Sequence, residues 1–314
     1  MPAASSLTVP AELAAFHERF NAASGREWVA ALPGLAAEFL DRWNLRPDGA
    51  PAHGMVALIL PVVCEDGTRA ALKLQPVDEE SVGEPLALRA WGGHGAVQLL
   101  GHDPDSGTML LERLDGARSL ATVPDDLAAL RHLAELLDRL HSAPAPAGLR
   151  QLSDIARGLL EQQPQAAPAL ADPAERRLLA DCAAAVREVI DEPGRRLLHW
   201  DLHYENVLAT LPGARREPWL AIDPKPLVGD PGFDLLPALD NRWADIAATG
   251  DPARAVLRRF DLLTEVLELD RHRAVCWTLG RVLQNALWDI EDGETSLIPE
   301  QVTIVRALLS RPGR

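Results

Sequence analysis

The chain has 314 residues, more than one hydrophobic core usually holds, so two lobes or domains are predicted. Hydrophobic residues make up 47% of the chain. Its formal net charge of -15 argues against nucleic acid or an anionic membrane as partner and is compatible with a cationic small molecule. No apolar run is long enough to span a membrane, and we expect no secretory signal. The three scattered cysteines predict reduced thiols and a cytoplasmic location. We expect a monomer.

Residues 1–114 are expected to form the first lobe, which contains a small, mostly antiparallel sheet. Apolar residues at helical spacing predict two packing helices near the start, and alternating apolar runs separated by Gly and Asp turns predict the strands that follow. The predicted elements are, in order, helices over 11–20 and 28–43, a turn-rich loop over 47–54, strands over 55–63 and 69–75, a helix over 78–91, and strands over 96–102 and 108–114.

Lys73 lies inside the apolar strand over 69–75 and must find a counter-charge there. Of the 31 basic residues only Lys73 and Lys225 are lysine. Lysine is a compact charge whereas arginine is a wide planar fork, so a narrow phosphate site can require lysine. The candidate partners on the helix over 78–91 are Glu79, Glu80 and Glu84, of which Glu84 is preferred because it precedes an apolar face, whereas the other two suit a solvated first turn.

Two further parts of this lobe are candidates for nucleotide binding. The loop over 47–54 retains only Gly49 and Gly54 of a glycine-rich phosphate loop, and a hairpin connection explains it equally well. The connector from Glu112 through Leu114 to Gly116 is where a kinase backbone would hydrogen-bond adenine. An ordinary domain linker remains the alternative.

Residues 115–314 are expected to form a larger helical lobe. The predicted helices cover 126–142, about 154–161, 175–191, 252–269, 271–291 and 299–309. Between the third and fourth of them lie two short apolar segments, each interrupted by polar residues that can do chemistry.

The first interruption contains Asp201 and Asn206, and the second contains Asp223. Hard oxygen ligands for Mg²⁺ and a carboxylate that orients a hydroxyl are what phosphoryl transfer needs, and D-x-x-x-x-N followed by a later Asp is the spacing that kinases use. The alternative is that Asp201 and Asn206 are only turn residues. The Lys73 strand upstream favours the metal and phosphate site.

The runs HWDLHYENVLA (199–209) and IDPKPLVGDPGFDL (222–235) resemble the aminoglycoside and hydroxyurea phosphotransferase family, in the branch that contains streptomycin 6-phosphotransferases. The similarity also covers the Lys73 strand, residues 109–114 and residues 284–289. Trp200 departs from the His-Gly-Asp of broader aminoglycoside kinases. The resemblance implies an α+β, two-lobed protein-kinase-like fold with a small β lobe and a helical lobe, and ATP-dependent phosphorylation of a cationic antibiotic.

The resemblance also implies roles for individual residues. Asp201 would accept or orient the proton of the substrate hydroxyl, Asn206 and Asp223 would hold Mg²⁺, Lys73 would bind the ATP phosphates, and Glu84 would position Lys73. His199 is expected to support the loop, Asp234 to accept hydrogen bonds from its backbone, and Asp230 to do the same or to face the substrate. His203 and Lys225 are further candidates near the metal.

The expected substrate is streptomycin, phosphorylated at its 6-hydroxyl. A guanidinium-bearing sugar needs acidic partners on the helical lobe. The candidates are Asp240, Trp243, Asp289 and Asp292. The alternatives are hydroxyurea or another small hydroxyl compound, and a non-catalytic kinase-like protein that binds nucleotide.

Overall fold

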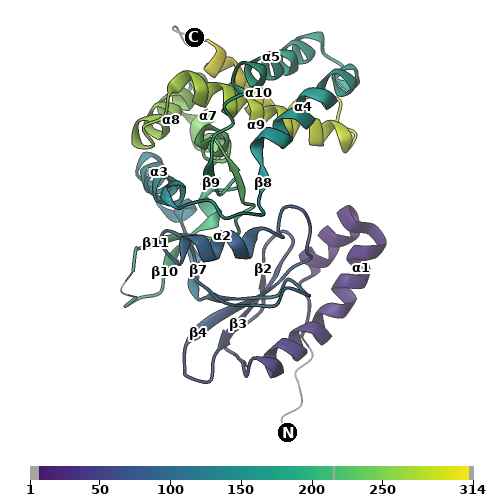
Figure 1. Cartoon of the computed structure of the whole chain (residues 1–314), viewed down its shortest axis with the longest axis vertical. Helices are drawn as coiled ribbons and strands as arrows, with labels where there is room; N and C mark the ends of the chain where they lie inside the picture. Colours follow the sequence, from purple (N-terminus) through teal and green to yellow (C-terminus); the bar gives the residue numbers. More distant parts are fainter. Residues whose placement is uncertain (1–6, 215, 311–314) are drawn as a thin grey trace. The chain divides into compact units, whose positions relative to one another are not determined.

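The structure, a computed structural model, describes residues 7–214 and 216–310, which group into two compact units (Figure 1). The first unit comprises the described part of residues 1–93 together with Val97–Leu114 and Leu211–Ala214. The second comprises His94–Ala96, Asp115–Thr210 and the described part of residues 215–314. The domain boundary placed after residue 114 from the sequence stays a prediction.

The first unit contains one antiparallel sheet and two helices. Its elements are α1 (Ala11–Arg42), β1 (Arg46–Pro47), β2 (Ala52–His53), β3 (Leu58–Val63), β4 (Arg69–Leu74), α2 (Glu84–Trp91), β5 (Leu99–His102) and β6 (Met109–Glu112). The strand order is β1-β3-β4-β6-β5, with β2 also paired to β3.

Strand β4 shows how the sheet separates its core from its functional face. Successive strand side chains point to opposite faces. Leu72 and Leu74 are fully buried in one apolar cluster with Leu32 and Phe39 of α1. Lys73 lies between the two leucines and therefore points to the other face of the sheet. The apolar face thus fixes the direction in which the lysine points.

Two predicted helices of this unit differ from the structure. The helices expected over 11–20 and 28–43 are joined in α1, with a break at Ala22, where φ is 45° and ψ is -119°. The helix expected over 78–91 begins only at Glu84. Asp78 accepts hydrogen bonds from the backbone N–H of Glu80 and from Ser81, and this local turn competes with helix.

The second unit is mainly helical and contains two small sheets. Its helices are α3 (Asp126–Ser142), α4 (Leu152–Ala166), α5 (Pro173–Val189), α6 (Leu236–Asp240), α7 (Trp243–Ala248), α8 (Pro252–Val266), α9 (Arg271–Glu291) and α10 (Pro299–Leu309), with 3₁₀ turns η1 (Leu120–Thr122), η2 (Ala167–Ala169), η3 (Tyr204–Asn206) and η4 (Pro231–Asp234). Helices α9 and α10 match their predicted bounds, α4 is longer than predicted, and α6 and α7 were not predicted.

The two sheets carry the residues of the predicted catalytic loop. One has the order β11-β10-β7 and the other β8-β12-β9. The strands are β7 (Leu114–Ser119), whose first residue belongs to the first unit, β8 (Arg150–Gln151), β9 (Arg196–Leu198), β10 (Val207–Thr210), β11 (Trp219–Ala221) and β12 (Leu227–Gly229). The segment over 199–206 joins β9 to β10 and so crosses from one sheet to the other.

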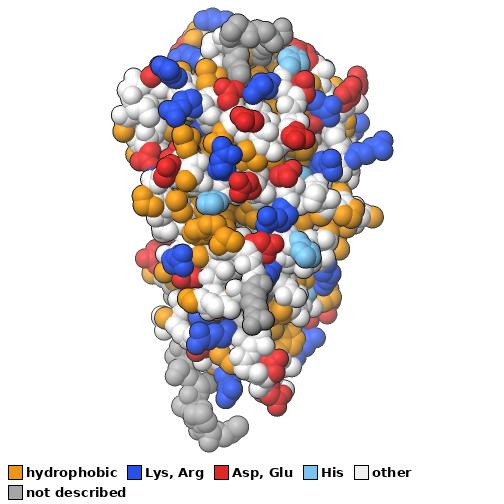
Figure 2. Space-filling model, turned by 90° about the vertical axis from the view of Figure 1, so that its left-hand side faces the viewer, with side chains coloured by type: hydrophobic (Ala, Val, Ile, Leu, Met, Phe, Trp, Pro, Cys, Tyr) orange, Lys and Arg blue, Asp and Glu red, His pale blue; other side chains and the backbone are white. Residues whose placement is uncertain are grey.

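Charge is dispersed over the surface that can be inspected. Figure 2 shows acidic and basic side chains mixed with hydrophobic ones on one face, without a single acidic patch there. Among the described residues, every helix is too short or too polar to cross a membrane.

Arg259 of α8 is buried and holds the chain just before and after the end of α6. Its guanidinium donates to both carboxylate oxygens of Asp126 at the start of α3, at 3.2 and 2.7 Å. It also donates to the carbonyl oxygens of Ala238, Leu239 and Asn241. A single side chain therefore connects α3, α8 and the end of α6.

We predict that Arg259→Met destabilises the protein by about 3–5 kcal/mol, because it leaves buried carbonyl groups and a carboxylate without their donor. Urea denaturation would measure the loss. Arg258→Met is the matched control, since Arg258 is the exposed neighbour on the same helix. Equal stability of the two variants would contradict the assignment.

Candidate active site

The loop over 199–206 is held by Asp234, the last residue of η4. Its carboxylate accepts hydrogen bonds from the backbone N–H of His199 at 3.1 Å and of Trp200 at 2.5 Å. The His141 ring of α3 lies 2.8 Å from the same carboxylate. Asp234 is fully buried, so these groups replace water around it. The hydrogen bonds expected from the loop backbone to Asp234 are confirmed.

His199 is fully buried and supports the loop from within. Its Nε2 lies 3.0 Å from the carbonyl oxygen of Ile222, which requires Nε2 to carry the proton, and its Nδ1 accepts from the Asp201 backbone N–H at 3.4 Å. Burial lowers the pKa of the imidazole to about 4. His199 is therefore neutral at pH 7. Its two ring nitrogens connect the segment that contains Asp201 to the segment that contains Asp223.

Trp200 has a backbone conformation and surroundings that the sequence did not reveal. Its φ of 67° lies in the left-handed region that usually favours glycine. The indole is 1% exposed and has guanidinium groups close to its ring, Arg150 at 4.6 Å and Arg281 at 4.9 Å from the centroid. Trp288 packs against it edge-on at 5.9 Å. These contacts compensate for the backbone strain.

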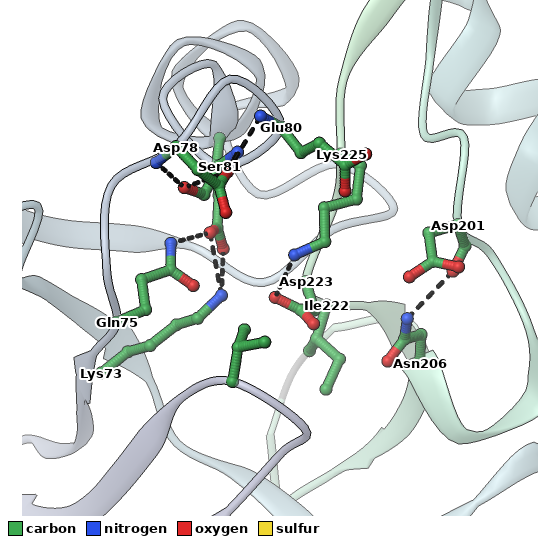
Figure 3. Close-up of polar contacts among 12 residues, drawn as sticks. Lys73, Gln75, Asp78, Glu80, Ser81, Asp201, Asn206, Ile222, Asp223 and Lys225 are labelled. Carbon is green, nitrogen blue, oxygen red and sulfur yellow. Dashed lines mark hydrogen bonds and ion pairs between the residues drawn. The ribbon is translucent and has the colours of Figure 1, made fainter. Parts of the chain in front are cut away.

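Asp201, Asn206 and Asp223 are placed as oxygen donors. The amide nitrogen of Asn206 donates to the backbone carbonyl of Asp201 at 2.9 Å, which leaves its amide oxygen as the free acceptor (Figure 3). Asp223, at a φ of 56°, has a carboxylate oxygen 3.8 Å from Lys225 Nζ. An amide oxygen and carboxylates are ligands that Mg²⁺ prefers, so the residues fit this ion.

The charges around Asp201 oppose one another. Burial is the main cause that raises the pKa of its carboxyl, and the negative charge of Asp223 raises it further. The positive charges of Arg281 and Lys225, and that of His203 when protonated, lower the same pKa. The Asp223 carboxylate is therefore close enough to influence the charge of Asp201.

A pocket of about 230 Å³ opens beside Asp201. It is lined by Asp201, His203, Leu236, Pro237, Asp240, Asn241, Arg281 and Asn285. The sequence pointed to Asp201, His203 and Asp240 but missed Asn241, Arg281 and Asn285. The sequence offered a signal for one of the three only: Asn285 lies within residues 284–289, which resemble the family, whereas nothing in the sequence distinguishes Arg281 from other arginines.

The polar groups of this pocket are mostly hydrogen-bond acceptors. Burial raises the pKa of Asp240 to about 6. Within the described chain, no side chain donates to the carboxylates of Asp201 or Asp240, and the buried Oδ1 of Asn241 has no hydrogen-bond donor. The Arg281 guanidinium donates instead to Gln284 and Asn285. The pocket therefore suits a ligand that brings its own N–H groups.

Several predicted site residues lie away from this pocket. Trp243 begins α7, and Asp292 is an exposed residue at the end of α9. Asp289 lines a narrow, mainly apolar pocket formed with α5 and α10. Asp230 caps η4 and bonds Arg273 at 2.6 Å, in yet another pocket. The structure does not bring these four residues together with Asp201.

In the first unit, Lys73 and Glu84 form a buried ion pair. The lysine Nζ lies 2.7 and 2.8 Å from the two carboxylate oxygens, and Gln75 donates to the same carboxylate at 2.7 Å (Figure 3). Glu84 was the expected partner, and the pair is present. A buried glutamate with two donors holds the lysine in one position.

The other nucleotide candidates of the first unit have simple positions. Gly54 follows β2, donates its backbone N–H to Ala57 and has open space around its Cα. Glu112 ends β6 and Leu114 begins β7. The side chain of Leu114 is buried, whereas that of Glu112 is partly exposed.

Comparison with known proteins gives consistent results. The family profile described as "aminoglycoside/hydroxyurea antibiotic resistance kinase" matches residues 42–293. A streptomycin 6-kinase of Streptomyces glaucescens is 62% identical over 96% of both chains. A hydroxyurea phosphotransferase of Kitasatospora aureofaciens is 58% identical over 97% of this chain and 87% of its own.

Solved structures show the same fold. The macrolide 2′-phosphotransferase of Brachybacterium faecium aligns over 91% of this chain and 100% of its own, with a TM-score of 0.56 and 16% identity. The predicted α+β fold of the protein-kinase-like phosphotransferases is therefore confirmed.

We predict that Asp234→Asn loosens the loop over 199–206 without unfolding the unit. The amide offers one acceptor oxygen in place of two, so a backbone N–H of the loop loses its partner. Hydrogen exchange followed by mass spectrometry should show at least tenfold faster exchange in peptides covering this loop, with α10 unchanged. Asp154→Asn, at an exposed position of α4, is the control. Unchanged protection of the loop in Asp234→Asn would show that Asp234 does not hold it.

Proposed function

The chain belongs to the aminoglycoside/hydroxyurea antibiotic resistance kinase family, and we propose that it transfers the γ-phosphoryl group of ATP to the 6-hydroxyl of streptomycin, conferring resistance. A streptomycin 6-kinase that is 62% identical over nearly the full length supports this acceptor. We propose further that the enzyme acts as a monomer in the cytoplasm, in keeping with cysteines that form no disulfide in the part of the chain that the structure describes.

The acceptor-rich pocket is the observation that carries the choice of substrate. Among the described residues no side chain donates to the carboxylates of Asp201 or Asp240, and the buried Oδ1 of Asn241 has no donor. A guanidinium group presents five N–H donors and a positive charge, and streptomycin carries such groups on the ring that bears its 6-hydroxyl. Binding it would satisfy the orphan oxygen of Asn241 and favour the ionised form of Asp240.

Hydroxyurea is the second candidate, because a relative at 58% identity is a hydroxyurea phosphotransferase. Hydroxyurea is small and uncharged, so it would add no positive charge to that of the arginines already near the buried Asp240 carboxylate. The charge of the pocket favours the cationic substrate. A catalytically silent protein is disfavoured because Lys73, Asp201, Asn206 and Asp223 are all retained.

We assign the chemistry at the acceptor hydroxyl to Asp201. Its carboxylate lines the pocket and accepts the proton of the hydroxyl as the oxygen of that hydroxyl bonds to the γ-phosphorus and ADP leaves. Asn206 and Asp223 would hold Mg²⁺, which supplies positive charge to neutralise the phosphate oxygens. Lys225, close to Asp223, adds a second positive charge.

The first unit supplies the residues that would bind the phosphates of ATP. Lys73, fixed by Glu84 and buried to 97%, is a rigid point charge for the α- and β-phosphates. The backbone around Glu112 and Leu114 would bind adenine, and the turn at Gly54 would approach the phosphates. Such catalysis consists of placement and charge stabilisation, so rigid supports matter more than reactive groups.

A substrate panel tests the proposal. ADP release should be measured with streptomycin, other aminoglycosides and hydroxyurea, and the product fragmented by mass spectrometry. We expect turnover with streptomycin, phosphate on the 6-hydroxyl, and loss of at least 1,000-fold in kcat for Asp201→Asn. Background ADP release with streptomycin, or a higher kcat/KM for hydroxyurea, would refute the assignment.

We predict that the KM for streptomycin falls as the pH rises through about 6, because Asp240 is protonated below its raised pKa and then cannot pair with a cation. The nearby charges of Arg281, His203 and Arg259 all act to lower that pKa. In Asp240→Asn the KM at pH 8 should be at least tenfold higher, with kcat changed less. Steady-state kinetics between pH 5 and 8 would measure both.

The control for this prediction is Asp292→Asn, at an exposed acid outside the pocket. Its KM profile should match that of the parent enzyme.

Stability provides an independent check of the Asp240 pKa. A raised pKa means that ionising Asp240 costs folding free energy above pH 4, so Asp240→Asn should be the more stable protein at pH 8 and not at pH 3. Parallel KM profiles for the parent and Asp240→Asn would exclude Asp240 from substrate binding.

A further inference from the structure

Three potential metal ligands of different chemistry converge where the end of α5 meets the start of α9. The Nε2 of His272 lies 3.2 Å from a carboxylate oxygen of Glu188 and 3.8 Å from the Sγ of Cys276. All three ligand atoms lie within 4.8 Å of one another. None of these residues takes part in the proposed phosphoryl transfer.

The backbone of two packed helices sets the positions of these ligands. His272 and Cys276 are four residues apart, so they lie on the same side of the first turns of α9. Glu188 is one residue from the end of α5, and the two helices approach so closely further along that a Cβ on Gly280 would lie 3.0 Å from Val186. The two helices therefore hold the three side chains next to one another, with their ligand atoms within 4.8 Å.

We propose that Glu188, His272 and Cys276 bind a zinc-class divalent transition metal, with water as a fourth ligand, and thereby link α5 to α9. In a tetrahedral site with zinc bonds of about 2.0–2.3 Å, neighbouring ligand atoms lie roughly 3.3–3.6 Å apart. The separations from His272 Nε2, 3.2 Å to Glu188 and 3.8 Å to Cys276, bracket that range, and the Glu188 and Cys276 ligand atoms lie within 4.8 Å of each other. Cys276 is fully buried, whereas Glu188 and His272 are half exposed, which leaves the solvent side open to water.

The donor set distinguishes this site from the proposed magnesium site. Thiolate and imidazole donors suit zinc, cobalt or copper and are poor ligands for Mg²⁺, which prefers oxygen. Thiolate and carboxylate together bring two negative charges. The flanking cations Arg271 and Arg273 are each engaged by carboxylates, Arg271 by Asp261 and Arg273 by Asp230 and Glu192.

A metal here would stabilise the helix that carries part of the acceptor pocket. Arg281 lies nine residues after His272 on α9, which is about 13 Å along the helix axis. The bound metal would link the first turn of α9 to α5 and so suppress fraying of α9 at this end. The metal site shares no residue with the proposed phosphoryl-transfer site, so metal binding and phosphoryl transfer can each be tested without the other.

Cobalt binding tests the site directly. The full-length protein, stripped of metal with a chelator, should be titrated with Co²⁺ and followed by absorption spectroscopy. We expect a thiolate-to-cobalt charge-transfer band and the intense visible bands of tetrahedral cobalt, both displaced by Zn²⁺. Cys276→Ser should lose the charge-transfer band, whereas Cys64→Ser, in the first unit, should keep it. Absence of the band in the parent protein, or its persistence in Cys276→Ser, would overturn the proposal.

Thermal unfolding with Zn²⁺ gives a second measurement that does not depend on a buried substitution. Zn²⁺ at a hundredfold excess over its Kd should raise the Tm by roughly 5 °C. The exposed substitutions Glu188→Gln and His272→Gln should each weaken Zn²⁺ binding at least tenfold, and Asp181→Asn on the same helix as Glu188 should not. An equal Tm rise in all four proteins would refute the site.

Discussion

A buried carboxylate, that of Asp234, determines the conformation on which the candidate active site depends. It receives the backbone N–H groups of His199 and Trp200 and contacts His141. With both N–H groups directed inward, the next residue, Asp201, lies at the edge of the acceptor pocket. His199 then ties the loop to Ile222, the residue before Asp223. The positions of Asp201, Asn206 and Asp223 thus depend on hydrogen bonds made by the Asp234 carboxylate and the His199 imidazole.

The site combines features that are individually unfavourable to folding. Trp200 and Asp223 both have left-handed backbone conformations, and Asp240 is buried enough to raise its pKa to about 6. Each costs stability that tertiary contacts must offset, here the arginines beside Trp200 and the anchoring of the α6 end by Arg259. We propose that these unfavourable features are retained because they arrange the acceptor pocket to receive a cation before the substrate binds.

Much of the fold could be predicted because its elements have strong local signals. Helix α9 begins after an Asp cap and keeps an apolar face throughout, and Lys73 interrupts an apolar strand where a counter-charge is obligatory. Helix α2 was predicted too long because the Asp78 turn competes with helix.

The pocket was predicted only in part. Asp240 lies in it, but Asp289 and Asp292 do not, since their position depends on how α9 packs and not on their residue type. Arg281 and Asn241 acquire their position only through tertiary contacts.

The central claim is that the pocket beside Asp201 binds a guanidinium group of streptomycin and presents the 6-hydroxyl to that carboxylate. A crystal structure of Asp201→Asn with streptomycin and a non-hydrolysable ATP analogue would test it most directly. We expect a guanidinium within hydrogen-bond distance of the Asp240 carboxylate and the Oδ1 of Asn241, with the 6-hydroxyl facing position 201. Streptomycin bound with its guanidinium groups away from Asp240, or with another hydroxyl at position 201, would contradict the account.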